Sequence, residues 1–109
     1  MSSAVSNAEL IDCVIEMLEV ATHSILYHRN VYARQHFRMC RKYHVPTPMC
    51  RSPLVCDYVA SALGQLRKVI LSGVVERYVV VIVERISARV VERFVFEIAS
   101  LVDQPPSPD

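Results

Sequence analysis

The chain has 109 residues, enough for one small domain and too few for separate catalytic and cofactor-binding domains. Apolar residues make up 52% of the chain and charged residues 21%, so we expect a globular protein with a core. Twelve Lys and Arg residues against eleven Asp and Glu residues leave a formal net charge of +1. The overall charge therefore gives no reason to expect a nucleic acid, an anionic membrane or an acidic substrate as partner.

The compartment is indicated by the cysteines and by the N-terminal sequence. Four cysteines are present without the pattern of a secretory signal, so we expect reduced thiols in a cytosolic or nuclear protein. The longest uninterrupted apolar stretch, residues 78–83, is far shorter than the roughly 20 residues that a membrane-spanning helix needs. We expect no membrane segment.

The first predicted element is a helix over residues 8–29, after an N-terminal tail of residues 1–7. Its apolar residues recur at intervals of three and four, namely Leu10, Ile11, Val14, Met17, Leu18, Ala21, Ile25 and Leu26. Acidic residues occupy only the first half of the opposite face. The pattern predicts a central helix whose first half touches water and whose second half is buried on most sides.

A basic window follows this helix. No acidic residue occurs between Glu19 and Asp57. Six of the twelve basic residues lie there, namely Arg29, Arg34, Arg38, Arg41, Lys42 and Arg51. Pro46, Pro48 and Pro53 forbid regular helix over residues 45–52, so we expect an extended connection there.

A second helix is predicted over residues 53–71, because Ser52 and Pro53 are typical of an N-cap and a first helical position. Residues 75–84 are rich in β-branched and aromatic side chains, which predicts a strand buried on both faces. A reversal at residues 86–89 pairs it with a strand over residues 90–98. The fold class is α+β, and residues 101–109 form a disordered Pro-rich tail.

The predicted sheet is incomplete. A lone two-stranded hairpin is marginally stable, and a strand buried on both faces needs partners along its edges. We therefore expect further strands from a second copy of the chain, from a partner, or from the rest of a larger domain.

Several blocks of residues, in this order and with similar spacing, carry a family resemblance. The blocks are Glu19-Val20-Ala21, Ile25-Leu26-Tyr27, Val31-Tyr32, Arg41-Lys42-Tyr43-His44-Val45-Pro46, Val79-Val80-Val81-Ile82 and Val91-Glu92-Arg93-Phe94-Val95-Phe96-Glu97-Ile98. They resemble the mitotic-arrest-deficient-like HORMA family, in particular its HORMA-domain accessory subunit of DNA polymerase zeta. The resemblance implies the N-terminal half of a HORMA domain over residues 8–100, with the C-terminal safety belt absent.

The resemblance also implies a function. Family members are non-catalytic adaptors that capture a proline-containing peptide of the catalytic subunit of polymerase zeta or of another protein. They serve translesion synthesis, DNA repair and mitotic checkpoint control in the cell cycle, in the nucleus with some cytoplasmic protein. A second copy or another HORMA protein would complete the sheet.

One functional residue carries over from the family. The bound peptide lies against the helix that matches residues 53–71, where a tyrosine matching Tyr58 packs on prolines of the partner. The spacing places Val55 and Ala62 on the same helix face as Tyr58. Ala33 stands where the family commonly has proline.

Metal binding and catalysis are not expected. His36, Cys40, His44, Cys50 and Cys56 are spaced unlike structural zinc ligands, which usually include cysteines paired two to four residues apart. No Gly-rich loop, G-x-S-x-G or H-E-x-x-H motif occurs, and only two glycines are present. We expect no metal, no cofactor and no enzymatic activity.

The alternative function is a small basic nucleic-acid-binding domain that acts through the window from Arg29 to Arg51. In it Arg34, Arg38, Arg41 and Lys42 would neutralise phosphates, and the interleaved aromatic residues Tyr32, Phe37 and Tyr43 would stack on bases. A solvated cationic face, or a protein partner with an acidic patch, explains the same charges, and direct nucleic-acid binding is the less expected reading.

Overall fold

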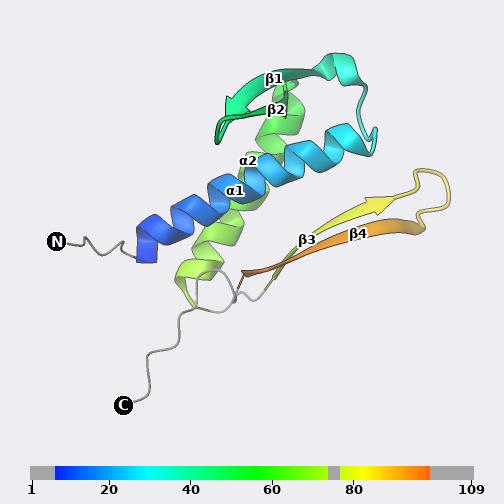
Figure 1. Cartoon of the computed structure of the whole chain (residues 1–109). Helices are drawn as coiled ribbons and strands as arrows, with labels where there is room; N and C mark the ends of the chain where they lie inside the picture. The colour runs from blue at the N-terminus through cyan, green and yellow to red at the C-terminus, as the bar shows by residue number, and fades with distance from the viewer. Residues whose placement is uncertain (1–6, 74–76, 99–109) are drawn as a thin grey trace.

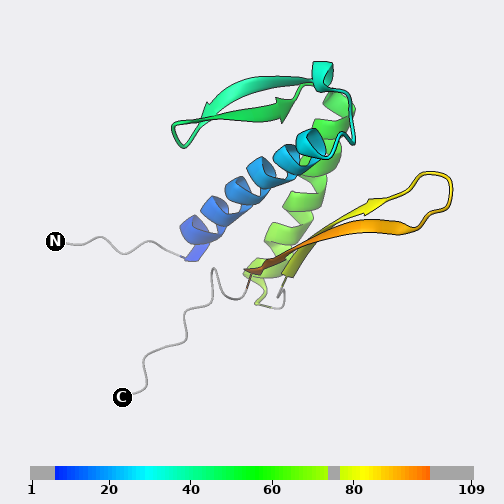
Figure 2. The same cartoon turned by 45° about the vertical axis from the view of Figure 1, so that its right-hand side comes forward.

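The computed structural model describes residues 7–73 and 77–98. The elements, in chain order, are α1 (Asn7–His28), the 3-10 helix η1 (Arg34–His36), β1 (Phe37–Lys42), β2 (Val45–Cys50), α2 (Pro53–Leu71), β3 (Arg77–Val83) and β4 (Val90–Glu97). Two crossing helices carry two separate antiparallel hairpins on different sides (Figures 1 and 2). The predicted α+β class is confirmed. The predicted tails fall outside the described residues, except for Asn7, which begins α1.

The core lies where α1 crosses α2. Its buried residues are Ile11, Val14 and Leu18 from α1, Val59, Leu63 and Ile70 from α2, and Ile98 after β4. Leu18 and Leu63 are each 2% exposed, and burial of one such side chain contributes about 1.5–3 kcal/mol. The predicted apolar stripes of both helices therefore face each other. Among the described residues, no helix is long and apolar enough to cross a membrane.

The β3–β4 hairpin covers the helices with one face only. Its register runs from Arg77 opposite Glu97 to Val83 opposite Val90. Tyr78 and Phe96 pack against the core, whereas alternate residues on the other face, Val79, Val81, Val83, Val91 and Val95, are 37–66% exposed. The predicted burial of this strand on both faces is wrong within the described part of the chain, because the helices cover only one side of the hairpin.

A second hairpin replaces the predicted extended connection over residues 45–52. β1 pairs antiparallel with β2, from Phe37 opposite Cys50 to Lys42 opposite Val45. Between the strands, Tyr43 and His44 have φ of 52° and 65°, the signs that a two-residue type I′ turn requires. The prediction of extended backbone was right, but the pairing of that backbone into a ladder was missed.

The prolines of β2 fit this ladder because of its hydrogen-bond alternation. The residues that flank a two-residue turn form a hydrogen-bonded pair, here Lys42 and Val45, and such pairs alternate with non-hydrogen-bonded ones. Pro46 and Pro48 therefore occupy non-hydrogen-bonded positions, where the missing N–H would have pointed away from β1. Neither proline costs the hairpin a hydrogen bond.

Two neighbouring polar residues of α1 each anchor one hairpin. The backbone N–H of Cys50 donates to Nδ1 of His23 at 2.9 Å, and His23 is 2% exposed. Thr22 Oγ1 donates to the carbonyl of Leu18 at 2.7 Å and lies 2.8 Å from the Tyr78 hydroxyl. Since the single hydroxyl hydrogen of Thr22 is already used, Tyr78 donates to Thr22. His23 thus holds β2, and Thr22 holds β3.

Acidification should destabilise the fold through His23. Burial lowers the pKa of His23 below 6.5, against a raising contribution from Glu19 and with a lowering one from Lys42. The unfolded imidazole therefore binds a proton at higher pH than the folded one. The stabilisation is present above pH 6.5 and is lost as pH falls through the lower pKa of the folded state.

The measurement is the free energy of unfolding in urea between about pH 7.5 and pH 5. His23→Phe should lower stability by about 1–3 kcal/mol at neutral pH, because the Cys50 N–H loses its acceptor, and should flatten the pH dependence. The exposed His28, changed to Phe, is the control and should shift stability by less than about 0.5 kcal/mol. An unaltered pH dependence in His23→Phe would contradict the assignment.

The connection between α1 and β1 is compatible with proline at position 33. Ala33 has φ −61° and ψ 146°, inside the range of proline, and no backbone hydrogen bond of the described residues uses its N–H. Ala33→Pro should therefore raise the unfolding free energy by about 0.4–1 kcal/mol, by restricting the unfolded chain. Ala60→Pro, inside α2, should instead lower it by about 3 kcal/mol or more. Thermal and urea unfolding of both variants provide the check.

Candidate functional site

A pocket of about 310 Å³ opens at the N-terminal end of α2. Its lining residues come from the α1–β1 connection with η1, from the end of β2, and from the N-cap and first turns of α2. They are Tyr32, His36, Cys50, Ser52, Leu54, Val55 and Tyr58. The wall is mostly aromatic and aliphatic, with few polar groups to fix the orientation of a ligand.

The rim of the pocket exposes large apolar side chains. Leu54 is 83% exposed, Tyr58 is 75% exposed and Tyr32 is 40% exposed. Leu54 and Tyr58 are four residues apart and share one face of α2. Clustered exposed apolar groups of this kind mark interaction sites more often than scattered ones do. The site suits an extended apolar segment better than a charged small molecule.

The structure separates the predicted binding residues. Tyr58 and Val55 both line the pocket, whereas Ala62 is exposed one turn farther along α2 and does not line it. Leu54, expected as part of the buried stripe of α2, instead faces solvent at the rim. The part these residues play in binding stays a prediction.

Five lining residues were not among the predicted binding residues, namely Ser52 and Leu54 at the start of α2 and three residues from outside that helix. Tyr32 and His36 belong to the connection before β1, and Cys50 ends β2. The position of each depends on how that segment packs against α1 and α2. The available signal for Tyr32 was local, since an aromatic residue in a short connection between two elements is often a contact residue.

The Cys56 thiol near the pocket is a hydrogen-bond donor. Cys56 Sγ donates to the carbonyl oxygen of Cys50 at 3.0 Å. Burial raises the pKa of the Cys56 thiol, and the neighbouring Cys50, Asp57 and Glu19 raise it further. A raised pKa leaves little thiolate, so Cys56 is a poor nucleophile. All four cysteines are unbridged.

The five residues considered for zinc do not gather into one site. His36 and Cys50 line the pocket and Cys56 donates to the Cys50 carbonyl, whereas Cys40 is on β1 and His44 is in the hairpin turn. No group of three or more His, Cys, Asp or Glu residues that would hold a metal occurs within residues 7–73 and 77–98.

We therefore expect purified protein to retain much less than one equivalent of zinc after dialysis against a chelator. Elemental analysis of wild type, beside Cys40→Ser and Cys50→Ser, checks this expectation. Stoichiometric zinc that is lost in either variant would contradict it.

Arg29, Arg34 and Arg51 of the basic window contact other groups of the chain. Arg29 Nε donates to both carboxylate oxygens of Glu92, at 2.9 and 3.1 Å. The Arg34 guanidinium lies over the ring of Tyr27, 5.2 Å from its centroid. Arg51 Nη2 donates to the carbonyl of Gln35 at 3.0 Å. Arg29 thus joins the end of α1 to β4, whereas Arg34 and Arg51 brace the connection between α1 and β1.

The rest of the window lies on β1. Arg38 and Arg41 are exposed there, and Lys42 is half-buried. Of the predicted electrostatic surface, Arg38 and Arg41 are exposed, with Arg41 Nη1 donating to the carbonyl of His44 at 3.4 Å, while Arg34 packs on an aromatic ring. Phe37 is 8% exposed and packs against Tyr27 at 5.3 Å between ring centroids, so it is not available to stack on a base.

Comparison with known proteins identifies the fold family. No protein-family model matches the chain. The human mitotic spindle assembly checkpoint protein MAD2B is 41% identical over 95 residues, which cover 87% of this chain and 43% of that protein. MAD2B of Dictyostelium discoideum is 36% identical over 90 residues, covering 83% of this chain and 27% of that protein. A chain in a crystal structure of the mitotic checkpoint complex matches with a TM-score of 0.77 and 28% identity, covering 80% of this chain and 48% of that one.

Over most of its length the chain is similar to MAD2-like HORMA proteins. Its 109 residues span less than half the length of these relatives. The helix pair with its antiparallel strands is accordingly a partial MAD2-like HORMA fold, as the sequence resemblance implied.

Proposed function

We propose that the chain is a non-catalytic HORMA-type adaptor that binds a proline-containing segment of a partner protein in the pocket at the start of α2. The observation that carries this proposal is the exposed aromatic and aliphatic rim formed by Tyr32, Leu54 and Tyr58 around a pocket of about 310 Å³. The raised pKa of the Cys56 thiol supports a binding role over a catalytic one.

Proline suits this pocket for physical reasons. A proline-rich segment is already extended, so it loses little conformational entropy on docking. Its rings pack on aromatic side chains, and the missing N–H of proline needs no acceptor from an apolar wall. The phenol groups of Tyr32 and Tyr58 still offer hydrogen bonds to the carbonyls of the segment.

The partner that we propose is the catalytic subunit of DNA polymerase zeta or another protein with a similar segment. The chain would then serve translesion synthesis and DNA repair in the nucleus, with some protein in the cytoplasm. Kinship with proteins named for the mitotic spindle assembly checkpoint supports a related role in the cell cycle. Among the described residues β3 and β4 form a two-stranded sheet, so each has an edge without a neighbouring strand, which supports completion of the sheet by a second copy, a HORMA partner or further strands of a longer domain.

The alternative of a nucleic-acid-binding domain has less support. Phe37 is buried, and Arg29, Arg34 and Arg51 are engaged with groups of the same chain. Tyr43 keeps 58% exposure, but its hydroxyl donates to Glu16. The described window therefore lacks the ring and cation pairs that single-strand binding uses.

Titration with a proline-containing peptide from the polymerase zeta catalytic subunit tests the adaptor role. Binding should be weak, in the ~10 μM to mM range, because the pocket alone buries little surface. Tyr58→Ala should weaken binding at least about fivefold, because it removes the exposed aromatic wall. NMR shifts should map to Tyr32, Leu54 and Tyr58, and sodium chloride should change the affinity little.

Tyr43→Ala is the matched control, since it removes another exposed tyrosine outside the pocket and should leave affinity unchanged. Shifts confined to Arg34, Arg38, Arg41 and Lys42, abolished by salt and indifferent to Tyr58→Ala, would replace the adaptor role with the electrostatic one.

A further inference from the structure

β1 has an open edge. In the alternation set by the Tyr43-His44 turn, Met39 and Arg41 are non-hydrogen-bonded positions, so their N–H and C=O groups point away from β2. Two hydrogen bonds fit the same alternation, since the N–H of Cys50 turns outward to His23 and that of Arg51 turns inward to the His36 carbonyl. Within the described chain, no hydrogen bond reaches these outward groups of Met39 and Arg41.

The opposite edge of the hairpin is closed. Pro46 and Pro48 have no N–H to offer there, and the outward N–H of Cys50 is held by His23. β2 also packs against α1, whereas β1 lies on the outside of the molecule (Figure 1). A further strand would therefore add beside β1.

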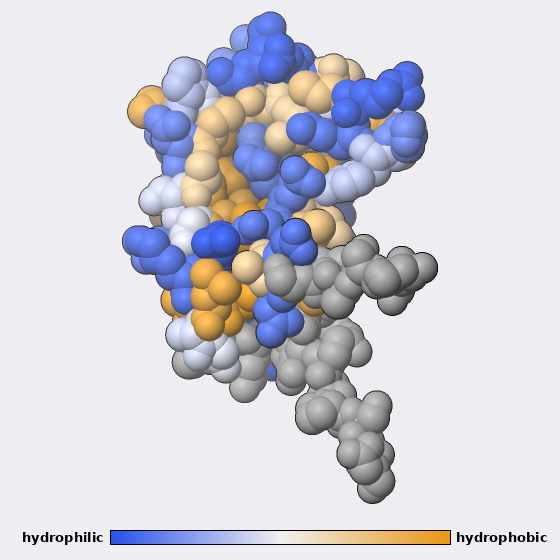
Figure 3. Space-filling model, turned by 90° about the vertical axis from the view of Figure 1, so that its left-hand side faces the viewer, coloured by the Kyte–Doolittle hydropathy of each residue, from blue (hydrophilic) through white to orange (hydrophobic). Residues whose placement is uncertain are grey.

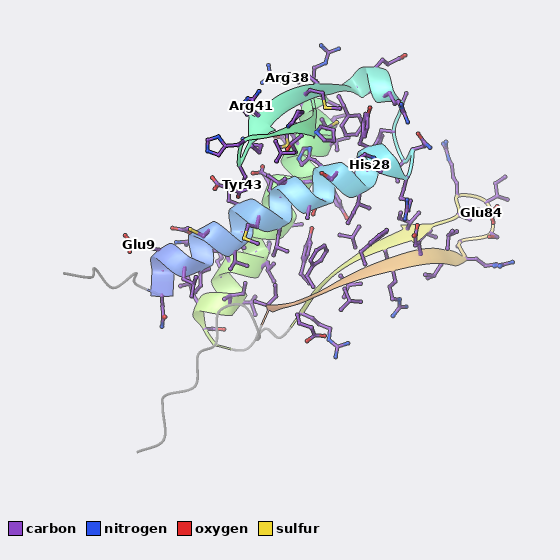
Figure 4. All side chains as sticks on the ribbon, viewed as in Figure 1. Glu9, His28, Arg38, Arg41, Tyr43 and Glu84 are labelled. Carbon is purple, nitrogen blue, oxygen red and sulfur yellow. The ribbon has the colours of Figure 1, made fainter. Side chains whose placement is uncertain are left out.

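The open edge is basic. Arg38 and Arg41 are exposed on β1, and neither strand of the hairpin contains an acidic residue. Figure 4 shows Arg38 and Arg41 on the outer side of β1, away from the helices, and Figure 3 shows hydrophilic side chains gathered at this end of the molecule. Side chains alternate along a strand, so residues three apart place one guanidinium on each face of the ribbon.

These features select one occupant. A second copy paired through β1 would bring Arg38 and Arg41 beside the same residues of its partner, and like charges repel. A nucleic acid would neutralise the arginines but would leave the row of backbone donors and acceptors without matching partners. An extended acidic peptide satisfies both, because its backbone completes the ladder and its carboxylates meet the guanidinium groups.

We propose that β1 accepts an extended acidic segment of a partner protein as a third strand, paired with the backbone of Met39 and Arg41 and ion-paired with Arg38 and Arg41. The Met39 side chain is 58% exposed beside this edge and shares a face with Arg41, so a segment with carboxylates on both faces and an apolar residue near Met39 fits it well. This surface is separate from the pocket at Tyr58 and does not depend on the proposed function.

The test uses the whole chain and a fluorescein-labelled Glu-Thr peptide of Glu-Glu-Thr-Thr repeats, which presents carboxylates on both faces of an extended strand. Fluorescence anisotropy should detect binding that weakens about tenfold in the double variant Arg38→Glu, Arg41→Glu, and that is unchanged in Arg77→Glu on β3. Hydrogen exchange followed by NMR should show new protection at the Met39 and Arg41 amides when the peptide binds.

Backbone pairing is tested first by a change in the peptide, which requires no variant of the protein. The same peptide with N-methyl groups on alternate residues should bind wild type about tenfold more weakly. Met39→Pro removes an outward N–H that the β1–β2 ladder does not use. This variant should therefore bind the peptide more weakly while keeping the hairpin. Circular dichroism establishes that this variant is folded.

Four results would overturn the proposal. They are no binding of the Glu-Thr peptide, equal binding of its N-methylated form, no new protection at Met39 and Arg41, and tighter binding of single-stranded DNA to Arg38 and Arg41 than of the peptide. Tyr58→Ala should leave peptide binding at β1 unchanged, so a failure of the adaptor role is distinguishable from a failure here.

Discussion

The arrangement of the two hairpins depends on a pair of buried hydrogen bonds from the middle of α1. Thr22 accepts the Tyr78 hydroxyl of β3, and His23 accepts the Cys50 N–H of β2. Consecutive residues of an α-helix point about 100° apart, so these neighbours face different sides of α1. A buried polar group without a partner costs about 1–3 kcal/mol, so an arrangement that broke either bond would be less stable by about that amount. The hairpins therefore lie on different sides of one helix. Two exposed contacts add to these bonds, since Arg29 directly after α1 pairs with Glu92 of β4, and the Tyr43 hydroxyl of the β1–β2 turn donates to Glu16.

The His23 bond also determines the two surfaces proposed for binding. Cys50 is the last residue of β2, and only Arg51 and Ser52 separate it from the first residue of α2. Holding Cys50 thus fixes the wall of the pocket relative to Tyr58. The same bond uses the outward N–H at the end of β2, which leaves β1 as the free edge of that hairpin. The buried His23 imidazole therefore helps to position both the pocket at Tyr58 and the open edge of β1.

Much of this fold was predictable because apolar periodicity is a local property. It predicted both helices and the β3–β4 hairpin close to their observed bounds. The β1–β2 hairpin was missed because Pro46 and Pro48 resemble strand breakers until their register is known, and because the turn at Tyr43 and His44 contains no glycine. Tyr58 was predicted as a binding residue through a family resemblance and Val55 through helical spacing. Tyr32 and His36 reach the pocket along a connection whose path tertiary packing determines. The uncovered face of β3–β4 could not be predicted, since a run of β-branched residues reads the same with or without a covering layer.

That uncovered face has a property that follows from its composition. Its exposed apolar members, Val79, Val81, Val83, Val91 and Val95, are all valines, and they lie among the exposed charged residues Arg77, Arg93 and Glu97. β-Branching restricts χ1 of these valines to few rotamers even in solvent. Flexible surface side chains such as lysine or methionine lose considerable rotamer entropy when another surface covers them, whereas valine loses little. The exposed valines therefore keep nearly fixed conformations before another surface covers them. Most of the favourable free energy of covering them would come from the release of water.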